Sequence, residues 1–226
     1  MENYELQITN YELRMAIGDC WLTLLGLALV VVGYFGPWVP HETAALTVTG
    51  LELAEFAKFF PQVQGGGVPI IRVLFYLPLV IAFVLLSLVA SRSAIRLVRL
   101  AVPLFVAALL LAALFPYPIV NAVRQALAAR SSLHVDSQYV GQVVLVVAGV
   151  VCVLLIPLAR RLPRRLQGIL VTLLALGGAV PALWQFALLR PLVVALYGKP
   201  FGLGWGLIAC TAGFALLIVR SNDFSR

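Results

Sequence analysis

The stretch PIIRVLFYLPLVIAFVLLSLVA, residues 69–90, indicates the fold class of this chain most clearly, because it is 22 residues long and contains a single charged side chain. A helix of this length rises 1.5 Å per residue and clears the hydrocarbon core of a bilayer, which is about 30 Å thick. A second apolar run, residues 97–115, follows almost at once. The connection between the two runs is basic, with Arg92, Arg96 and Arg99. The pattern predicts two membrane-spanning helices joined by a short turn.

The whole chain has the composition of a membrane protein. Of its 226 residues, 62% are hydrophobic and 11% are charged, and the mean hydropathy is +1.04. A soluble domain averages about a quarter charged residues, and one soluble core could not hide this much apolar surface. The formal net charge of +7 comes from Lys and Arg residues that lie mainly between apolar runs, where anionic lipid headgroups are the nearest partner. We therefore expect contact with the lipid bilayer and not with nucleic acid.

Six apolar stretches are long enough to span a bilayer, so the sequence predicts an all-α, polytopic integral membrane protein with six transmembrane helices. The stretches are residues 16–39, 69–90, 97–115, 139–158, 166–189 and 203–219. The chain then divides into a flexible N-terminal tail at 1–15, a single transmembrane helical domain at 16–220 and a C-terminal tail at 221–226. No cofactor is needed to explain this organisation.

Local features within these stretches carry further structural predictions. Trp21 and Trp38 lie near the two ends of the first stretch and are expected to anchor it at the membrane interfaces. Arg190 and Pro191 are expected to end the fifth stretch, because proline removes a helical N–H group. Glycines of the sixth stretch, such as Gly206, allow a neighbouring backbone to approach closely.

The distribution of Lys and Arg predicts which side of the membrane each connection faces. If the N-terminus is inside, ten of the sixteen basic residues lie in short inner segments and six lie outside. The inner ones are Arg14, Arg92, Arg96, Arg99, Arg160, Arg161, Arg164, Arg165, Arg220 and Arg226. Cytoplasmic loops carry an excess of Lys and Arg, so both termini are expected in the cytoplasm and the protein in the inner or plasma membrane of the cell.

The outer connections are expected to carry short helices at the membrane surface. Thr49 and Glu52 form a capping-box pattern at the start of a predicted helix over residues 51–60, with Glu55 on the same stripe as Glu52. Residues 119–130 form a second amphipathic segment. Each outer connection holds such a short segment and each inner connection is a brief basic turn, so the chain divides into three hairpins. A true internal repeat and a mere likeness of hairpins both stay open.

The motifs predict no catalytic, cofactor or metal site. The chain has no GxSxG, HExxH or P-loop pattern. His41 and His134 both fall in outer connections, so they cannot face one another as axial haem ligands. A weak metal site with Glu42 or Asp136 is the alternative to solvated histidines. The three cysteines lack CxxC spacing and are interpreted as small hydrophobic residues.

Charged side chains near the ends of spans are candidates for structural or interface roles. Asp19 lies about one turn into the first span, where the helix dipole or an inner arginine favours a carboxylate. Arg72 lies just inside the second span. Its guanidinium either reaches out to the headgroups or forms an ion pair with Glu52 or Glu55 of the outer helix.

Two amides and one basic cluster complete the set of candidates. The side chains of Gln142 and Gln185 need hydrogen-bond partners on another helix if lipid surrounds them. The densest basic cluster lies between the fourth and fifth spans and is expected to meet anionic headgroups or a partner protein. It consists of Arg160, Arg161, Arg164 and Arg165.

The scarcity of chemistry-bearing residues favours a non-catalytic integral membrane subunit or scaffold that assembles with partner proteins. The alternative is the membrane-spanning permease component of a transporter, for example an exporter driven by a separate cytoplasmic ATPase. That alternative is an analogy of architecture, because six spans with cytoplasmic termini suit both functions. An intramembrane enzyme is a third alternative.

Overall fold

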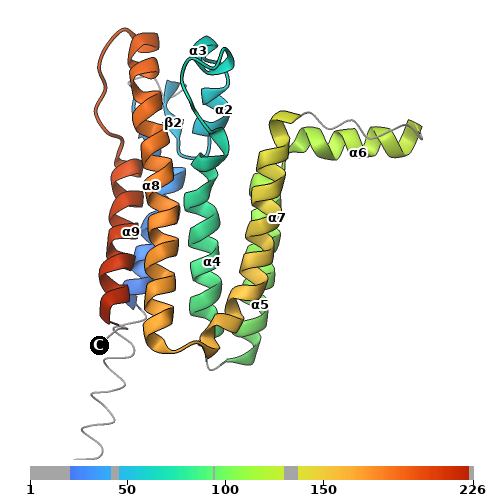
Figure 1. Ribbon diagram of the computed structural model, residues 1–226, viewed down its shortest axis with the longest axis vertical. Helices are drawn as coiled ribbons and strands as arrows, with labels where there is room; N and C mark the ends of the chain where they lie inside the picture. Colours follow the sequence, from blue (N-terminus) through green and yellow to red (C-terminus); the bar gives the residue numbers. More distant parts are fainter. Residues whose placement is uncertain (1–20, 42–45, 94, 130–136, 224–226) are drawn as a thin grey trace, which may run out of the picture.

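A computed structural model describes residues 21–41, 46–93, 95–129 and 137–223 of the chain. Long helices run roughly along one axis, and short helices and strands gather at one end of the bundle (Figure 1). The opposite end consists of turns between long helices. The predicted N-terminal tail at 1–15 lies outside the described residues, and of the predicted C-terminal tail at 221–226 only residues 221–223 are described, as the end of the last helix.

Four helical segments are long and apolar enough to cross a membrane. They are Arg72–Ser91, Arg96–Leu114, Val140–Arg161 and Arg164–Tyr197. The first joins the 3-10 helix η2 (Arg72–Tyr76) to α4 (Leu77–Ser91), the second is α5, the third joins α7 (Val140–Leu155) to η4 (Ile156–Arg161), and the fourth is α8. The predicted spans that begin at residues 69, 97, 139 and 166 are confirmed as apolar helices of spanning length.

Two further apolar helices within the described residues are shorter. They are the first helix, Trp21–Phe35, and the segment Trp205–Ser221 of α9 (Trp205–Asp223). The mostly helical fold agrees with the predicted class. Six spans in three hairpins is a finer statement that remains a prediction.

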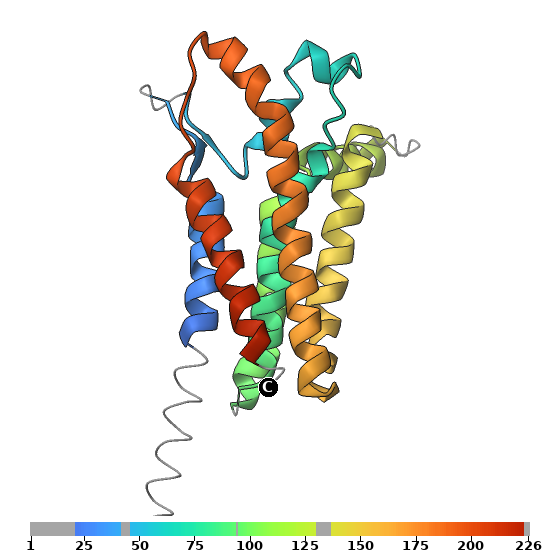
Figure 2. The same ribbon diagram turned by 60° about the vertical axis from the view of Figure 1, so that its left-hand side comes forward.

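Helix α4 lies at the centre of the bundle. It packs against α5 and α7 on one side and against α8 on the other, and α8 in turn packs against α9. Its side chains Leu79, Leu85 and Leu88 are buried in the core. The first helix lies beside α9, so the two ends of the described chain meet along one edge of the bundle (Figure 2).

Glycines bring the first helix and α9 into backbone contact. A Cβ atom added to Gly33 would lie 2.3 Å from the backbone nitrogen of Cys210, and one added to Gly206 would lie 2.5 Å from the carbonyl carbon of Gly36. No side chain fits at such separations, so only glycine permits this approach. The close contact predicted for Gly206 is confirmed.

Helix α8 continues through Arg190 and Pro191, so the prediction that the helix ends at this pair is wrong. Leu189 and Val193 are buried on either side of the proline, and their packing keeps the last turns helical despite the lost N–H group. The helix ends at Gly198, whose φ of 68° is left-handed. Its 34 residues rise about 51 Å, well beyond the thickness of a hydrocarbon core.

A small antiparallel sheet follows the first helix and was not predicted. Strand β1 (Pro37–Val39) pairs with β2 (Val48–Thr49), with Pro37 opposite Thr49. Trp38 in β1 is only 1% exposed, and its ring packs edge-on against Phe186 of α8. The prediction that Trp38 anchors the chain at an interface is therefore wrong. Pro37 ends the helix early and turns the indole into the core.

The outer helix predicted over residues 51–60 is shorter than expected. The capping box forms, because the Thr49 N–H donates to Glu52 Oε2 at 2.9 Å and the Glu52 N–H donates to Thr49 Oγ1 at 3.4 Å. Helix α2 then covers only Leu53–Ala57, and Pro61 begins a separate helix, α3 (Pro61–Gln64). The predicted helix was expected to reach residue 60, next to Pro61. Proline suits the first turn of a helix, so Pro61 instead begins α3.

The second amphipathic segment is the helix α6 (Tyr117–Ala129). It leaves the top of α5 and runs away from the bundle at a steep angle to the long helices (Figure 1). The 3-10 helix η3 (Ser137–Tyr139) then leads into α7. The helix predicted at 119–130 is thus confirmed over most of its length, and residue 130 lies outside the described residues.

Candidate functional site at the basic end of the bundle

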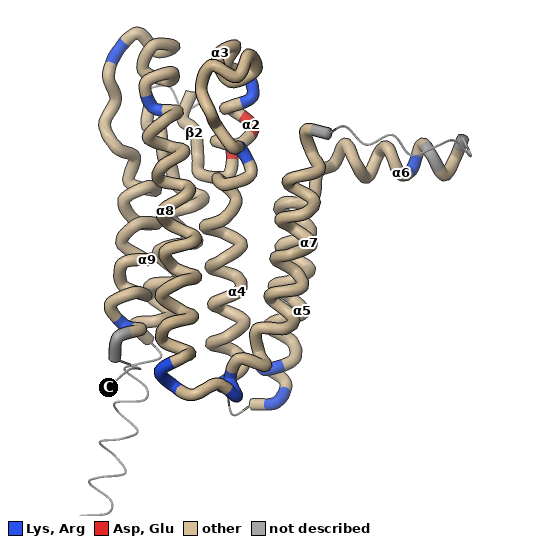
Figure 3. Tube along the Cα trace, viewed as in Figure 1, with Lys and Arg blue, Asp and Glu red and all other residues tan. Residues whose placement is uncertain are grey.

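Arginines gather at one end of the bundle, which we call the basic end. It is formed by the C-terminus of α4, the N-termini of α5 and α8, η4, and the last turn of α9 (Figure 3). Arg92, Arg96, Arg99, Arg160, Arg161, Arg164, Arg165 and Arg220 lie in these segments. The glutamates 52 and 55 lie at the other end, the far end. The far end also carries Lys58, Arg72, Arg190 and Lys199, so the basic end differs from it by its density of arginines.

A crevice of about 840 Å³ opens at the basic end among five helices. Its walls are largely apolar and come from the first helix, α4, α5, α8 and α9. Arg92, Arg164 and Arg220 line it together with Thr23 and Ser93. None of its lining residues within the described chain is acidic. We call this space the basic crevice.

Arg92 is held in place by Gln167, which lies at the start of α8. The guanidinium of Arg92 donates to Gln167 Oε1, and Gln167 Nε2 donates to the carbonyls of Arg160 at 3.0 Å and Leu162 at 2.8 Å. Partial burial among apolar side chains, and then the positive charge of Arg164, lower the pKa of Arg92. Arg92 and Arg164 thus bring two positive charges near one another at the wall of the crevice.

A second, smaller hollow of about 340 Å³ lies next to this crevice, on the side of η4. Arg96, Arg99, Arg160 and Arg161 line it together with Ser91. The cluster predicted at 160–165 is therefore divided. Arg160 and Arg161 face this hollow, Arg164 faces the basic crevice, and Arg165 lines neither.

The two amides singled out in the sequence hydrogen-bond to the backbone of other segments. Gln142 Nε2 donates to the carbonyl of Leu114, the last residue of α5, at 2.7 Å. Gln185 is buried, and its Oε1 accepts the N–H of Ile71 at 2.8 Å. Both side chains find the partners on another segment that an amide in lipid requires. These hydrogen bonds hold the C-terminus of α5 and the start of η2 against neighbouring helices.

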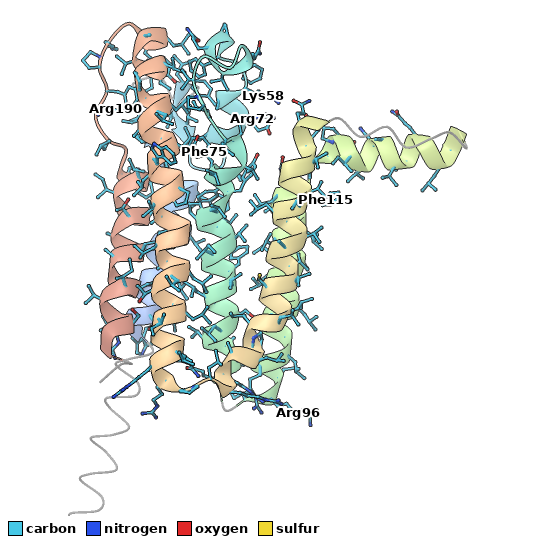
Figure 4. The ribbon with its side chains drawn as sticks, viewed as in Figure 1. Lys58, Arg72, Phe75, Arg96, Phe115 and Arg190 are labelled. Atoms are coloured by element: carbon cyan, nitrogen blue, oxygen red, sulfur yellow. The ribbon has the colours of Figure 1, made fainter. Side chains whose placement is uncertain are left out.

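Arg72 does not form the proposed ion pair with Glu52 or Glu55. Its guanidinium donates to the carbonyl of Gln138 at 3.3 Å, whereas Glu55 pairs with Lys58 in the next turn. Arg72, Glu55 and Tyr76 share a far-end hollow of about 250 Å³, close to Lys58 (Figure 4). The hydroxyl of Tyr76 donates a hydrogen bond of 3.4 Å to Glu55 Oε1. The contact from this segment to Glu55 is thus made by a tyrosine and not by Arg72.

Several predicted residues lie outside the described chain. These are Asp19, Cys20, Glu42, His134 and Asp136. His41 is described, and its ring packs edge-on against Tyr197 with 4.8 Å between centroids. Among the described residues, no group of three or more His, Cys, Asp or Glu side chains could hold a metal ion.

The sequence did not single out Gln167 or link Arg92 to Arg220. Arg92 and Arg220 lie far apart in the sequence, and only the packing of α8 against both α4 and α9 brings them to one crevice. Gln167 is a buried amide at the basic end, and its place two residues after Arg165, in a segment with four arginines, is the signal that could have revealed it. Comparison of this chain with protein-family models, curated proteins and solved structures found no match.

Proposed function

We propose that this chain is a non-catalytic integral membrane subunit with six spans in three hairpins, both termini in the cytoplasm, and a partner protein that contacts the α5–α7 hairpin. The observation that carries the proposal is the one-sided attachment of this hairpin. α5 and α7 pack mainly on each other and on α4, and α6 extends from their far end away from the bundle.

The dimensions of the hairpin support its placement across a bilayer. α5 rises about 28 Å over its 19 residues, close to the roughly 30 Å of a hydrocarbon core. At one of its ends α6 turns sideways, as an amphipathic helix at an interface does. At its other end lie Arg96 and Arg99. The positive-inside rule then favours a cytoplasmic basic end and an external α6.

The outward faces of the hairpin offer apolar surface to a partner helix or to lipid. Phe105 of α5 is 68% exposed and Val147 of α7 is 50% exposed. Lipid already surrounds these faces in a bilayer, so the hydrophobic effect contributes no free energy to their association with a partner helix. Association then depends on close packing and on contacts with the surface of α6. Arg124 and Leu127 of α6 are exposed, so the surface of α6 combines charged and apolar side chains. Such a surface suits contact with a partner protein at the level of the lipid headgroups.

Site-specific photo-crosslinking in native membranes tests the proposal. A benzophenone side chain replaces Phe105 or Val147 in the hairpin, with Leu173 of α8 and Ile208 of α9 as equally exposed controls. We expect one protein adduct of constant mass from the two hairpin positions and lipid adducts from the controls. Lipid adducts alone at all four positions would contradict the proposal. A crosslink from Leu162, in the basic turn, to a cytoplasmic ATPase would instead support the permease component of a transporter.

A further inference from the structure

We propose that the basic crevice is a binding site for one anionic phospholipid, with the phosphate held by Arg92, Arg164 and Arg220 and an acyl chain lying along the apolar walls. The inference rests on the membrane placement proposed above and not on the partner protein. It is carried by the presence of three arginines and a largely apolar lining in a single crevice.

The size and lining of the crevice suit an amphiphile. Its volume of about 840 Å³ falls within the roughly 300–1,000 Å³ typical of ligand sites. Apolar side chains of α4, α5 and α9, such as Leu86, Val102 and Leu217, form most of the wall. A soluble anion would leave this apolar wall uncovered, whereas an acyl chain covers it. The apolar part therefore distinguishes a lipid from free phosphate.

The charges select an anion with several acceptor oxygens. Arginine presents N–H groups in a planar fork that matches phosphate oxygens, and such charge-assisted hydrogen bonds are about twice as strong as neutral ones. Arg92 and Arg164 are close enough for the positive charge of Arg164 to disfavour that of Arg92, so a phosphate between them offsets their repulsion. The hydrogen bond from Arg92 to Gln167 holds this guanidinium in one position, which reduces the ordering needed when the lipid binds.

The position of the crevice fits the inner leaflet. It opens at the basic end, where α4 ends at Ser91 and α8 begins at Arg164, and these residues mark the ends of two segments of spanning length. A phosphate at that level lies where lipid headgroups lie, and the acyl chain then points into the hydrocarbon region. A zwitterionic lipid adds a cation that the three arginines disfavour.

Lipid retention by the purified chain tests this inference. The chain is reconstituted in nanodiscs of mixed phosphatidylcholine and phosphatidylglycerol, extracted with a neutral detergent and examined by native mass spectrometry. We expect one phosphatidylglycerol per chain to be retained. Arg164→Gln is expected to lower retention about tenfold, and Arg165→Gln, the adjacent arginine outside the crevice, to leave it unchanged. Equal effects of the two variants would overturn the proposal, as would equal retention of phosphatidylcholine.

A second pair of variants tests the apolar half. Val102→Trp on α5 narrows the crevice from its partly exposed rim, and Leu104→Trp places the same ring on the outward face of α5. We expect only Val102→Trp to reduce retention, with unchanged helical content in both. Displacement of the lipid by excess soluble glycerol phosphate would overturn the proposal in favour of a soluble phosphate ligand. Because the chain is studied alone, this result is independent of the crosslinking result for a partner.

Discussion

The hydroxyl of Ser87 on α4 donates a hydrogen bond of 2.7 Å to the backbone carbonyl of Val153 on α7. In a continuous helix the N–H four residues later would serve that carbonyl, but that position is Pro157, which has no N–H. Ser87 is buried and thus supplies the missing donor from the neighbouring helix. No water is present in the hydrocarbon region to hydrogen-bond to a buried carbonyl. The bond from Ser87 therefore determines the packing position of α4 against α7.

Ser87→Ala is expected to lower the free energy of unfolding by about 1–2 kcal/mol, because it leaves the Val153 carbonyl without this donor. Thermal and denaturant unfolding in detergent micelles, followed by circular dichroism, measures the change. Pro157→Ala in the Ser87→Ala background restores an N–H four residues after Val153 and should recover part of the loss. An absence of any recovery would show that the serine acts through packing alone.

Gln142→Leu is expected to lower the free energy of unfolding by about 1 kcal/mol for a related reason. Gln142 donates to the carbonyl of Leu114, and the residue four positions later is again a proline, Pro118. Gln125→Leu on the exposed surface of α6 is the matched control and should change stability little. The same unfolding measurement compares the two. Equal losses would mean that removal of an amide, and not of this bond, is responsible.

Gly33→Ala is expected to destabilise the chain by about 1–3 kcal/mol or more, because the new methyl group would meet the backbone of Cys210. Gly177→Ala on α8 is the control. Nothing lies within 4 Å of a Cβ at Gly177, and alanine favours helix more than glycine does, so this variant should be neutral or slightly stabilising. Thermal unfolding of both variants in one detergent distinguishes them. Similar losses in both would place the cost in the helix backbone and not in the contact with α9.

A double-mutant cycle should detect coupling between Glu55 and Lys58 but not between Glu55 and Arg72. The first pair forms a partly exposed ion pair within one turn, worth about 0.5 kcal/mol. Arg72 donates instead to the Gln138 carbonyl, so Arg72→Glu should not be rescued by Glu55→Arg. A rescue of stability by that charge reversal would contradict the far-end geometry.

Cysteine labelling should place residues 124 and 165 on opposite sides of the membrane. With the three native cysteines replaced, Arg124→Cys on α6 is expected to react with a membrane-impermeant maleimide in intact cells. Arg165→Cys is expected to react only after permeabilisation. The reverse pattern would invert the proposed orientation, and labelling of both in intact cells would remove the proposed bilayer placement.

The polar side chains within the spans show where prediction from the sequence stops. Each proline marks a carbonyl four residues earlier that loses its usual donor, so Leu114 and Val153 can be identified from the sequence alone. The donors cannot, because Gln142 and Ser87 belong to other helices. The third case differs, because its donors are near in the sequence. The carbonyl of Gly33, four residues before Pro37, accepts from the indole of Trp38 at 3.1 Å and from the N–H of Gly36.

Reading along the chain is enough to identify the helical class, four segments of spanning length, the capping box at Thr49 and Glu52, and the basic connections that lie at one end of the bundle. These features depend on hydrophobicity and on contacts between near neighbours along the chain. The packing of the helices was needed to show that Trp38 is buried, that α8 continues through Pro191, and that Arg92, Arg164 and Arg220 share one crevice. Those outcomes depend on which helices pack together, and in an almost uniformly apolar chain the hydrophobic pattern does not specify helix neighbours.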